Sequence, residues 1–261
     1  MSGETITLSG EILKVYQPEV IILPTPAEVD QFAATKFLEQ VQAKPNSVLT
    51  LPTGGTPEGK YRLIVQAYRE LGLDLSQLTT FNLDEYWRLA SSHVASYASY
   101  MQTHLFEHVN IPSSQRHIPN SEADDPRAEA FRYDTILRQH HVDFAIVGLG
   151  PGTTCHIGFN EKGSAHNSRT RYMPLDGQTL QANAQYFPDP AQMPRGSITQ
   201  GIGNILEAER IMLLAKGEGK AWGIQRTLEG EIGADAPASF LRLHPQVTFV
   251  VDAAAAHMLR R

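Results

Sequence analysis

A strand, a glycine-rich loop and a helix start follow one another in Ser47-Val48-Leu49-Thr50-Leu51-Pro52-Thr53-Gly54-Gly55-Thr56-Pro57. The first five residues favour a short buried strand. Thr56 suits a helix N-cap and Pro57 suits the first helical position, so we expect a helix to begin there. The two glycines let backbone N–H groups approach an anion at that helix start. The segment predicts a phosphate-binding loop, while a tight turn with a threonine cap explains this segment alone equally well.

The same alternation of strands and helices continues in both directions along the chain. Apolar runs predict strands over 20–23, 78–83, 143–148, 210–214 and 247–251. Capping residues and helical periodicity predict helices from 26, over 96–109, over 126–140 and over 216–229. Strands that alternate with helices imply βαβ units and right-handed crossovers. The expected fold class is α/β, with a mostly parallel sheet that helices cover on both faces.

Length and charge narrow the class of protein. A chain of 261 residues can bury a substantial core, and we expect a single domain over 1–261. Within it, the region of about 163–201 is less periodic and is a candidate lid or small subdomain. The chain has 22 basic and 28 acidic residues, a net charge of −6. Because nucleic-acid affinity depends largely on Lys and Arg contacts to phosphate, we expect no nucleic-acid partner.

The cysteine count and the N-terminus indicate a cytoplasmic protein. Cys155 is the one cysteine, which excludes an internal disulfide and favours a reducing compartment. Residues 1–5 lack the character of a signal peptide. No apolar run reaches the roughly 18 residues that span a bilayer, so we expect no membrane partner. Cys155 beside His156 also suggests a thiol nucleophile, but a small residue in a tight loop is the favoured interpretation.

Two further motifs stand at the ends of predicted strands. Asp84 and Glu85 follow the strand over 78–83, where a carboxylate can act as a base or simply cap a loop. After the strand over 143–148, a glycine-rich loop leads to His156, with Glu161 five residues later. A histidine held by a carboxylate can shuttle protons near neutral pH, although a structural histidine is commoner. Since ligands of open α/β sheets bind beyond the carboxyl ends of the strands, three motifs at three such ends predict one site.

Together these residues resemble the glucosamine-6-phosphate deaminase/isomerase family, from about residue 18 to 252. The specific matches are Leu51–Pro57, Phe81–Tyr86 and His156–Glu161, with weaker matches at 168–171, 201–203, 219–221 and 243–245. The resemblance implies a modified Rossmann-like, doubly wound fold that needs no metal or organic cofactor. It also implies a sugar-phosphate substrate, glucosamine 6-phosphate, that is converted to fructose 6-phosphate and ammonia.

The resemblance assigns roles to individual residues. Asp84 would be the base that moves a proton between C1 and C2, and His156 would help to open the sugar ring while Glu161 orients its imidazole. The phosphate would be held by Thr53, Gly54, Gly55, Thr56 and Lys220. This division is chemically sensible, because proton abstraction beside a carbonyl and ring opening need separate groups.

Two positions depart from the family pattern. The family has Asp or Asn two residues before the histidine, where this chain has Thr154, and the loop after Gly150 is two residues longer. Gln185 stands where the family has an arginine that clamps phosphate. Threonine cannot carry the charge of an acid, and glutamine cannot replace a cation beside a dianion. These changes predict a divergent member, either slow on the usual substrate or adapted to a related one.

Other interpretations of the sequence stay open at this point. The fold is shared by 6-phosphogluconolactonase, a hydrolase, and by non-catalytic proteins that bind sugar phosphates, but the three motifs favour the deaminase pattern. Arg169 and Arg171 suggest either an anion site at a subunit interface or, preferably, a solvated basic loop, and a homo-oligomer is neither predicted nor excluded. His140 and His141 have no second cluster at ligand spacing, so we expect no metal site.

Overall fold

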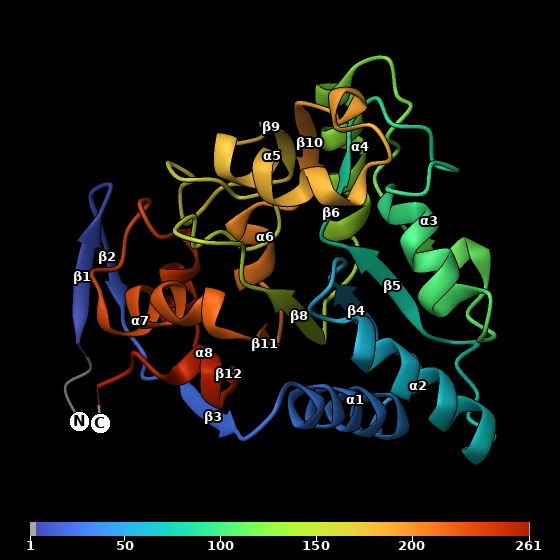
Figure 1. Ribbon diagram of the computed structural model, residues 1–261, viewed down its shortest axis with the longest axis horizontal. Helices are drawn as coiled ribbons and strands as arrows, with labels where there is room; N and C mark the ends of the chain where they lie inside the picture. Colours follow the sequence, from blue (N-terminus) through green and yellow to red (C-terminus); the bar gives the residue numbers. More distant parts are fainter. Residues whose placement is uncertain (1–3, 261) are drawn as a thin grey trace.

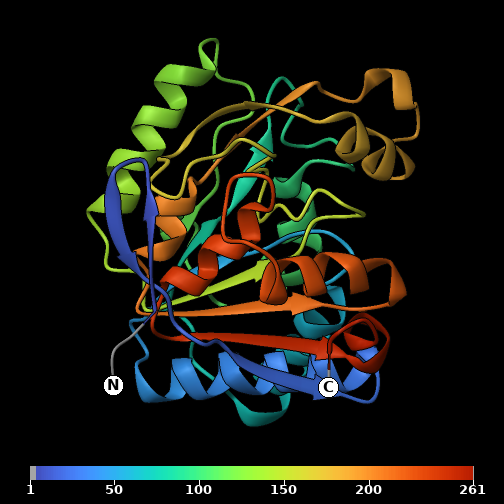
Figure 2. The same cartoon turned by 90° about the vertical axis from the view of Figure 1, so that its left-hand side faces the viewer.

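A seven-stranded parallel sheet forms the centre of the molecule, in the computed structural model, which describes residues 4–260 (Figure 1). Residues 1–3 and 261 lie outside the described part, and with them most of the segment over 1–5. In spatial order the strands are β3 (Glu19–Leu23), β12 (Val247–Asp252), β11 (Arg210–Ala215), β8 (Phe144–Gly148), β4 (Val48–Leu51), β5 (Thr79–Asn82) and β7 (Arg116–His117). Each adjacent pair is parallel, and Figure 2 shows β8, β11, β12 and β3 pointing the same way.

Helices cover both faces of this sheet, which explains the uninterrupted apolar strands. Phe144 and Ile146 of β8 pack in one buried cluster with α1 (Pro26–Ala43) and α2 (Glu58–Leu71). Ala145 and Val147 face the opposite way, into a second cluster. That cluster contains residues of α4 (Pro126–Arg138), α6 (Ile202–Leu206), α7 (Ala221–Glu229) and α8 (Ala253–Ala256). Alternate side chains of one strand therefore supply two cores, and the predicted doubly wound α/β fold is confirmed.

Two small antiparallel sheets were not expected from the sequence. β6 (Asp84–Tyr86), β10 (Gly196–Thr199) and β9 (Arg171–Pro174) form a three-stranded sheet, and β1 (Thr5–Leu8) pairs with β2 (Glu11–Lys14). The less periodic region of about 163–201 supplies β9, β10 and α5 (Gly177–Asn183). Since β6 follows β5 almost directly, this small sheet joins the region to the carboxyl edge of the main sheet.

Three predicted helix boundaries are wrong. α2 begins at Glu58 with Pro57 at the N-cap, so the side chain of Thr56 caps nothing there. The helix expected from Lys216 begins at Ala221, because Gly217 has a φ of 86° that no helix allows. The helix expected over 96–109 is α3 (Tyr97–Met101) followed by a π-helical turn over Gln102–Phe106. Thr25 does cap α1, accepting from the N–H of Glu28 at 3.3 Å.

No helix within residues 4–260 is long and apolar enough to cross a membrane.

Candidate active site

The predicted motifs meet at the carboxyl edge of four neighbouring strands. From β4 the chain proceeds to β5 and β7 on one side, and from β8 it proceeds to β11 and β12 on the other. The switch point between β4 and β8 is where open α/β sheets bind ligands. A cavity of about 630 Å³ lies there. The predicted residues that line it are Thr53, Gly54, Gly55, Thr56, Asp84, His156, Gln185 and Lys220. A larger hollow of about 930 Å³ between α2 and the π-helical turn shares only Gly55 with this set.

The glycine-rich loop is fixed by two tyrosines and leaves its own hydroxyls free. Tyr61 donates to the carbonyl of Pro52 at 2.6 Å, and Tyr100 donates to the carbonyl of Gly54 at 2.8 Å. Gly54 has a φ of 92°, which a side chain would strain. Within residues 4–260, the hydroxyls of Thr53 and Thr56 have no protein partner, so both can donate to an anion at the start of α2.

Lys220 brings a cation to the same cavity from the loop after β11. Its ammonium donates to the carbonyl of Leu149 at 2.8 Å. Burial lowers the pKa of Lys220 from 10.5 to about 8. An anion in the cavity would favour the charged form and raise that pKa again.

Asp84 lies in β6, where it is buried and lines the same cavity. Burial raises the pKa of its carboxyl from 3.8 to about 8, the charge of Glu85 adds to this, and the N–H of Phe159 partly offsets it. Gly158 gives the carboxyl its space, because a Cβ there would lie 3.2 Å from Oδ2 of Asp84. A carboxyl with a pKa near the working pH is suited to general base catalysis.

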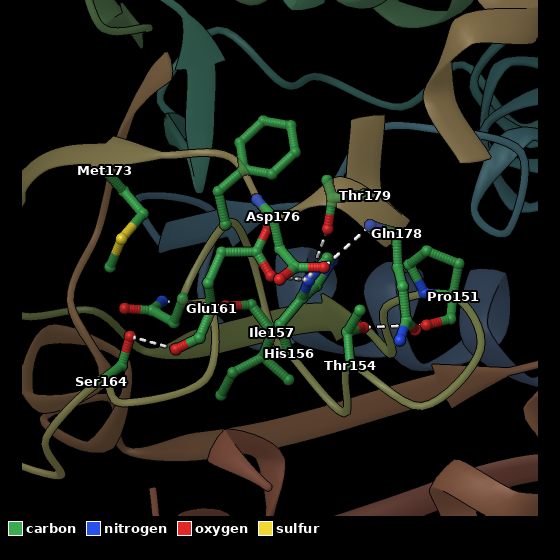
Figure 3. Close-up of polar contacts among 12 residues, drawn as sticks. Pro151, Thr154, His156, Ile157, Glu161, Ser164, Met173, Asp176, Gln178 and Thr179 are labelled. Carbon is green, nitrogen blue, oxygen red and sulfur yellow. Dashed lines mark hydrogen bonds and ion pairs between the residues drawn. The ribbon is translucent and has the colours of Figure 1, made fainter. Parts of the chain in front are cut away.

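His156 and Glu161 form a buried pair (Figure 3). Nδ1 of His156 lies 3.0 Å from Oε2 of Glu161, and the hydroxyl of Thr179 lies 3.4 Å from the same nitrogen. Burial alone would raise the pKa of Glu161, but the hydrogen bond and charge of His156, together with hydrogen bonds from Thr179 and the N–H of Asp176, lower that pKa. Nε2 of His156 lies on the side of Gly150, which also lines the cavity. One ring nitrogen is thus held by the carboxylate while the other remains for a ligand.

Glu85, Thr154 and Arg171 do not line the cavity. Glu85 accepts from the N–H groups of Tyr97 and Ala98 at 3.0 and 2.7 Å and so fixes the start of α3. The hydroxyl of Thr154 donates to the carbonyl of Pro151 at 2.8 Å rather than to His156 (Figure 3). The guanidinium of Arg171 donates to Asn160 at 2.9 Å and to Ser164 at 2.7 Å, so it supports the loop behind the histidine.

The structure argues against Cys155 as a nucleophile and shows a group of candidate metal ligands outside the cavity. Cys155 is buried, and burial raises the pKa of its thiol, which disfavours the thiolate. Exposed His141 and Glu209 do lie together with the buried Asp143, and these three residues do not line the cavity. Asp143 in that group already accepts from Lys44 at 2.6 Å and from the N–H of Val48 at 2.8 Å.

Comparison with known proteins places the chain in a family. Residues 25–250 match the sequence model of the glucosamine-6-phosphate isomerases/6-phosphogluconolactonase family. The chain belongs to this family. It is 42% identical over 242 residues to a glucosamine-6-phosphate deaminase of Rhodopirellula baltica, covering 92% of this chain and 96% of that protein. It is also 42% identical over 240 residues to glucosamine-6-phosphate deaminase 1 of Bacillus subtilis, covering 92% and 99%.

Solved structures support the same family fold. A monomeric glucosamine-6-phosphate deaminase has a TM-score of 0.89 and 41% identity, covering 92% of this chain and all 100% of that one. The 6-phosphogluconolactonase of Trypanosoma cruzi has a TM-score of 0.75 at 20% identity, which shows a shared fold alone. The resemblance inferred from the motifs is confirmed at the level of family and fold.

Several cavity residues of this family member were missed by sequence reasoning. Tyr86, Tyr97, Phe159 and Tyr186 supply aromatic walls, and Lys216 supplies a second cation. Tyr86 and Phe159 lie inside matched motifs, but nothing local marks an aromatic side chain as the wall of a cavity. Tyr97 and Tyr186 reach the cavity from short helices. Lys216 did have a signal, since it directly follows β11, but the wrong helix start placed it inside a helix.

Proposed function

We propose that this chain is a glucosamine-6-phosphate deaminase, which converts glucosamine 6-phosphate and water to fructose 6-phosphate and ammonia. The observation that carries the proposal is that Asp84 and His156 line one cavity together with the loop over 53–56 and Lys220. A general base, a proton shuttle and an anion site thus surround one volume of small-molecule size.

The geometry suggests how the work is divided. The loop over 53–56 and Lys220 hold the phosphate, which leaves the sugar between Asp84 and His156. His156, held by Glu161, moves the proton between the ring oxygen and the C1 hydroxyl as the ring opens. Asp84 then moves a proton from C2 to C1, water adds to the resulting C2 imine, and ammonia leaves.

Binding of the substrate would favour the ionised form of Asp84, which is the form that can accept a proton. The pKa of Asp84 is raised to about 8 mainly by burial. Glucosamine 6-phosphate carries an ammonium group on C2, and an opposite charge beside a carboxyl favours its ionised form. Binding of substrate therefore lowers the pKa of Asp84 at the step that needs the carboxylate.

The test is turnover of glucosamine 6-phosphate in heavy water, followed by proton NMR with an ammonia assay on the same sample. Wild-type protein should form fructose 6-phosphate and ammonia and should carry deuterium into the sugar. Asp84→Asn should lower kcat by about 10²–10⁴-fold, the usual share of a general base. Asp124→Asn, at an exposed acid outside the cavity, makes the same change of charge and should retain wild-type activity.

Three results would contradict this assignment. Unchanged turnover in Asp84→Asn would remove Asp84 from the mechanism. Rapid hydrolysis of 6-phosphogluconolactone by the wild type, without deamination, would favour the hydrolase, and tight binding without turnover would favour a sugar-phosphate-binding protein.

A further inference from the structure

Three charged side chains from distant parts of the chain meet beside the phosphate loop. Lys216 donates to both carboxylate oxygens of Asp30 at 2.8 and 2.9 Å. Lys60 is fully buried over the ring of Tyr61, at 4.0 Å from its centroid, and within residues 4–260 its ammonium has no hydrogen-bond partner. The cluster thus holds one carboxylate and two lysines, a charge balance suited to an incoming anion.

The contact of Asp30 with α2 places this cluster at the loop. A Cβ on Gly59 would lie 2.1 Å from Oδ2 of Asp30, so the carboxylate lies directly against the first turn of α2. That turn follows the loop over 53–56. Lys216, which the carboxylate holds, lines the same cavity as this loop and Lys220.

Burial of these charged groups costs desolvation free energy, which suggests a functional reason for the arrangement. The side chain of Lys216 is 14% exposed and that of Asp30 is 11% exposed. Burial lowers the pKa of Lys60 from 10.5 to about 7, while Asp30 raises it and Lys216 lowers it further. Lys216 is the member of this cluster that lines the cavity, and a buried ionisable group in a cavity wall is a candidate for ligand binding.

A cation is missing elsewhere in the same cavity. Gln185 lines it with an uncharged amide, which donates to the carbonyl of Ala182 at 2.8 Å. Charge-assisted contacts are stronger than those of neutral donors, so a second cation besides Lys220 would bind a dianionic phosphate more tightly than the amide of Gln185 does. The ammonium of Lys216 has three donors and gives its two assigned bonds to Asp30, which leaves one for an anion.

We propose that Lys216, oriented by Asp30, binds the phosphate of the substrate and supplies the cation that position 185 lacks. This inference rests on the proposed function for the identity of the substrate, but its anion chemistry is testable by itself. Asp30 acts as a positioning residue, which holds the ammonium at the loop. Lys216 is then a specificity-determining residue for phosphorylated over free amino sugars.

The test compares Lys216→Met with the wild type in steady-state kinetics with glucosamine 6-phosphate. KM should rise at least about tenfold, the size of one charge-assisted hydrogen bond, while kcat changes little. The double variant Gln185→Arg/Lys216→Met should recover most of the wild-type KM, since arginine restores a cation from the other wall. Lys36→Met, which removes an exposed lysine of α1, is the matched control and should leave both constants unchanged.

Calorimetric titration with inorganic phosphate separates this inference from the proposed function. Weaker phosphate binding by Lys216→Met than by wild type supports the inference even where the wild type does not deaminate the sugar. Wild-type phosphate affinity and wild-type KM in Lys216→Met would overturn it. A fall in kcat together with a rise in KM, neither reversed by Gln185→Arg, would show a structural role for Lys216 instead.

The double variant Asp30→Asn/Lys216→Met controls for the possibility that Lys216→Met lowers phosphate affinity by destabilising the fold. It removes the acid together with the lysine, so no carboxylate is left buried without its partner. The proposal requires the same loss of phosphate affinity in this variant, and normal affinity would overturn it.

Discussion

At the scale of single residues, burial tunes the two charged groups that would handle the substrate. The pKa of Asp84 is raised to about 8 and that of Lys220 is lowered to about 8, both chiefly by burial. The acid must lose its proton to act as a base, whereas the lysine must keep its proton to attract phosphate. Activity therefore depends on a pH range in which both conditions hold.

Lys220→Met tests the lysine half of this balance. Below pH 8 the wild-type lysine is charged, so wild type should exceed the variant in kcat/KM, mainly through KM. Above pH 8 the lysine becomes neutral, so this advantage should shrink. The ratio of the two kcat/KM values, measured from pH 6 to 10, cancels the titration of the substrate itself. A ratio that stays constant over this range would exclude Lys220 as a charged phosphate ligand.

At the scale of elements, the segments that follow the strands of the main sheet carry the chemistry. Each of β4, β5, β8 and β11 is followed by a segment that lines the cavity. The loop after β8 shows how tightly one of these segments is packed. A Cβ on Gly150 would lie 2.4 Å from Nε2 of His156, closer than atoms approach without a shift.

Gly150→Ala should therefore displace the imidazole without unfolding the protein. We expect kcat for glucosamine 6-phosphate to fall by about 10²-fold, as misplaced catalytic groups typically cause. The thermal midpoint should change by only a few degrees. Gly233→Ala is the control, because a Cβ there meets nothing within 4 Å. Wild-type kcat in Gly150→Ala would show that this approach does not position His156.

At the scale of the whole molecule, the three-stranded sheet has a buried cluster of its own. Tyr86 of β6 packs with Phe159, Leu175 and Phe187 in a third buried cluster. The cluster connects the region of about 163–201 to the strand that carries Asp84. The single domain over 1–261 and the lid over 163–201 nevertheless remain predictions.

Calorimetric unfolding distinguishes these two predictions. A single domain should give one transition, with the van't Hoff enthalpy equal to the calorimetric enthalpy. Phe187→Ala should lower its midpoint because it opens a cavity in the cluster. A separate early transition that only this variant shifts would identify the region of about 163–201 as an independent subdomain.

Local sequence patterns predicted much of the fold and part of the candidate site. The strand of Phe144–Val147, the loop over 53–56 and the acid after β5 are all readable, because burial on both faces and strand ends leave short-range signatures. Asp84 and His156 could be named from local patterns and Lys220 from the family resemblance, and all three line the cavity.

Tertiary structure alone decided the antiparallel sheet and the meeting of Asp30, Lys60 and Lys216. Asp30 and Lys216 are 186 positions apart, so no local pattern relates them. They become partners because α1, which carries Asp30, packs against α2 and against β12 of the main sheet. The strand β11, which precedes Lys216, lies next to β12 in that sheet. Residue periodicity indicates which face of a helix or strand is buried. Which side chains that face contacts depends on the spatial order of the strands in the sheet.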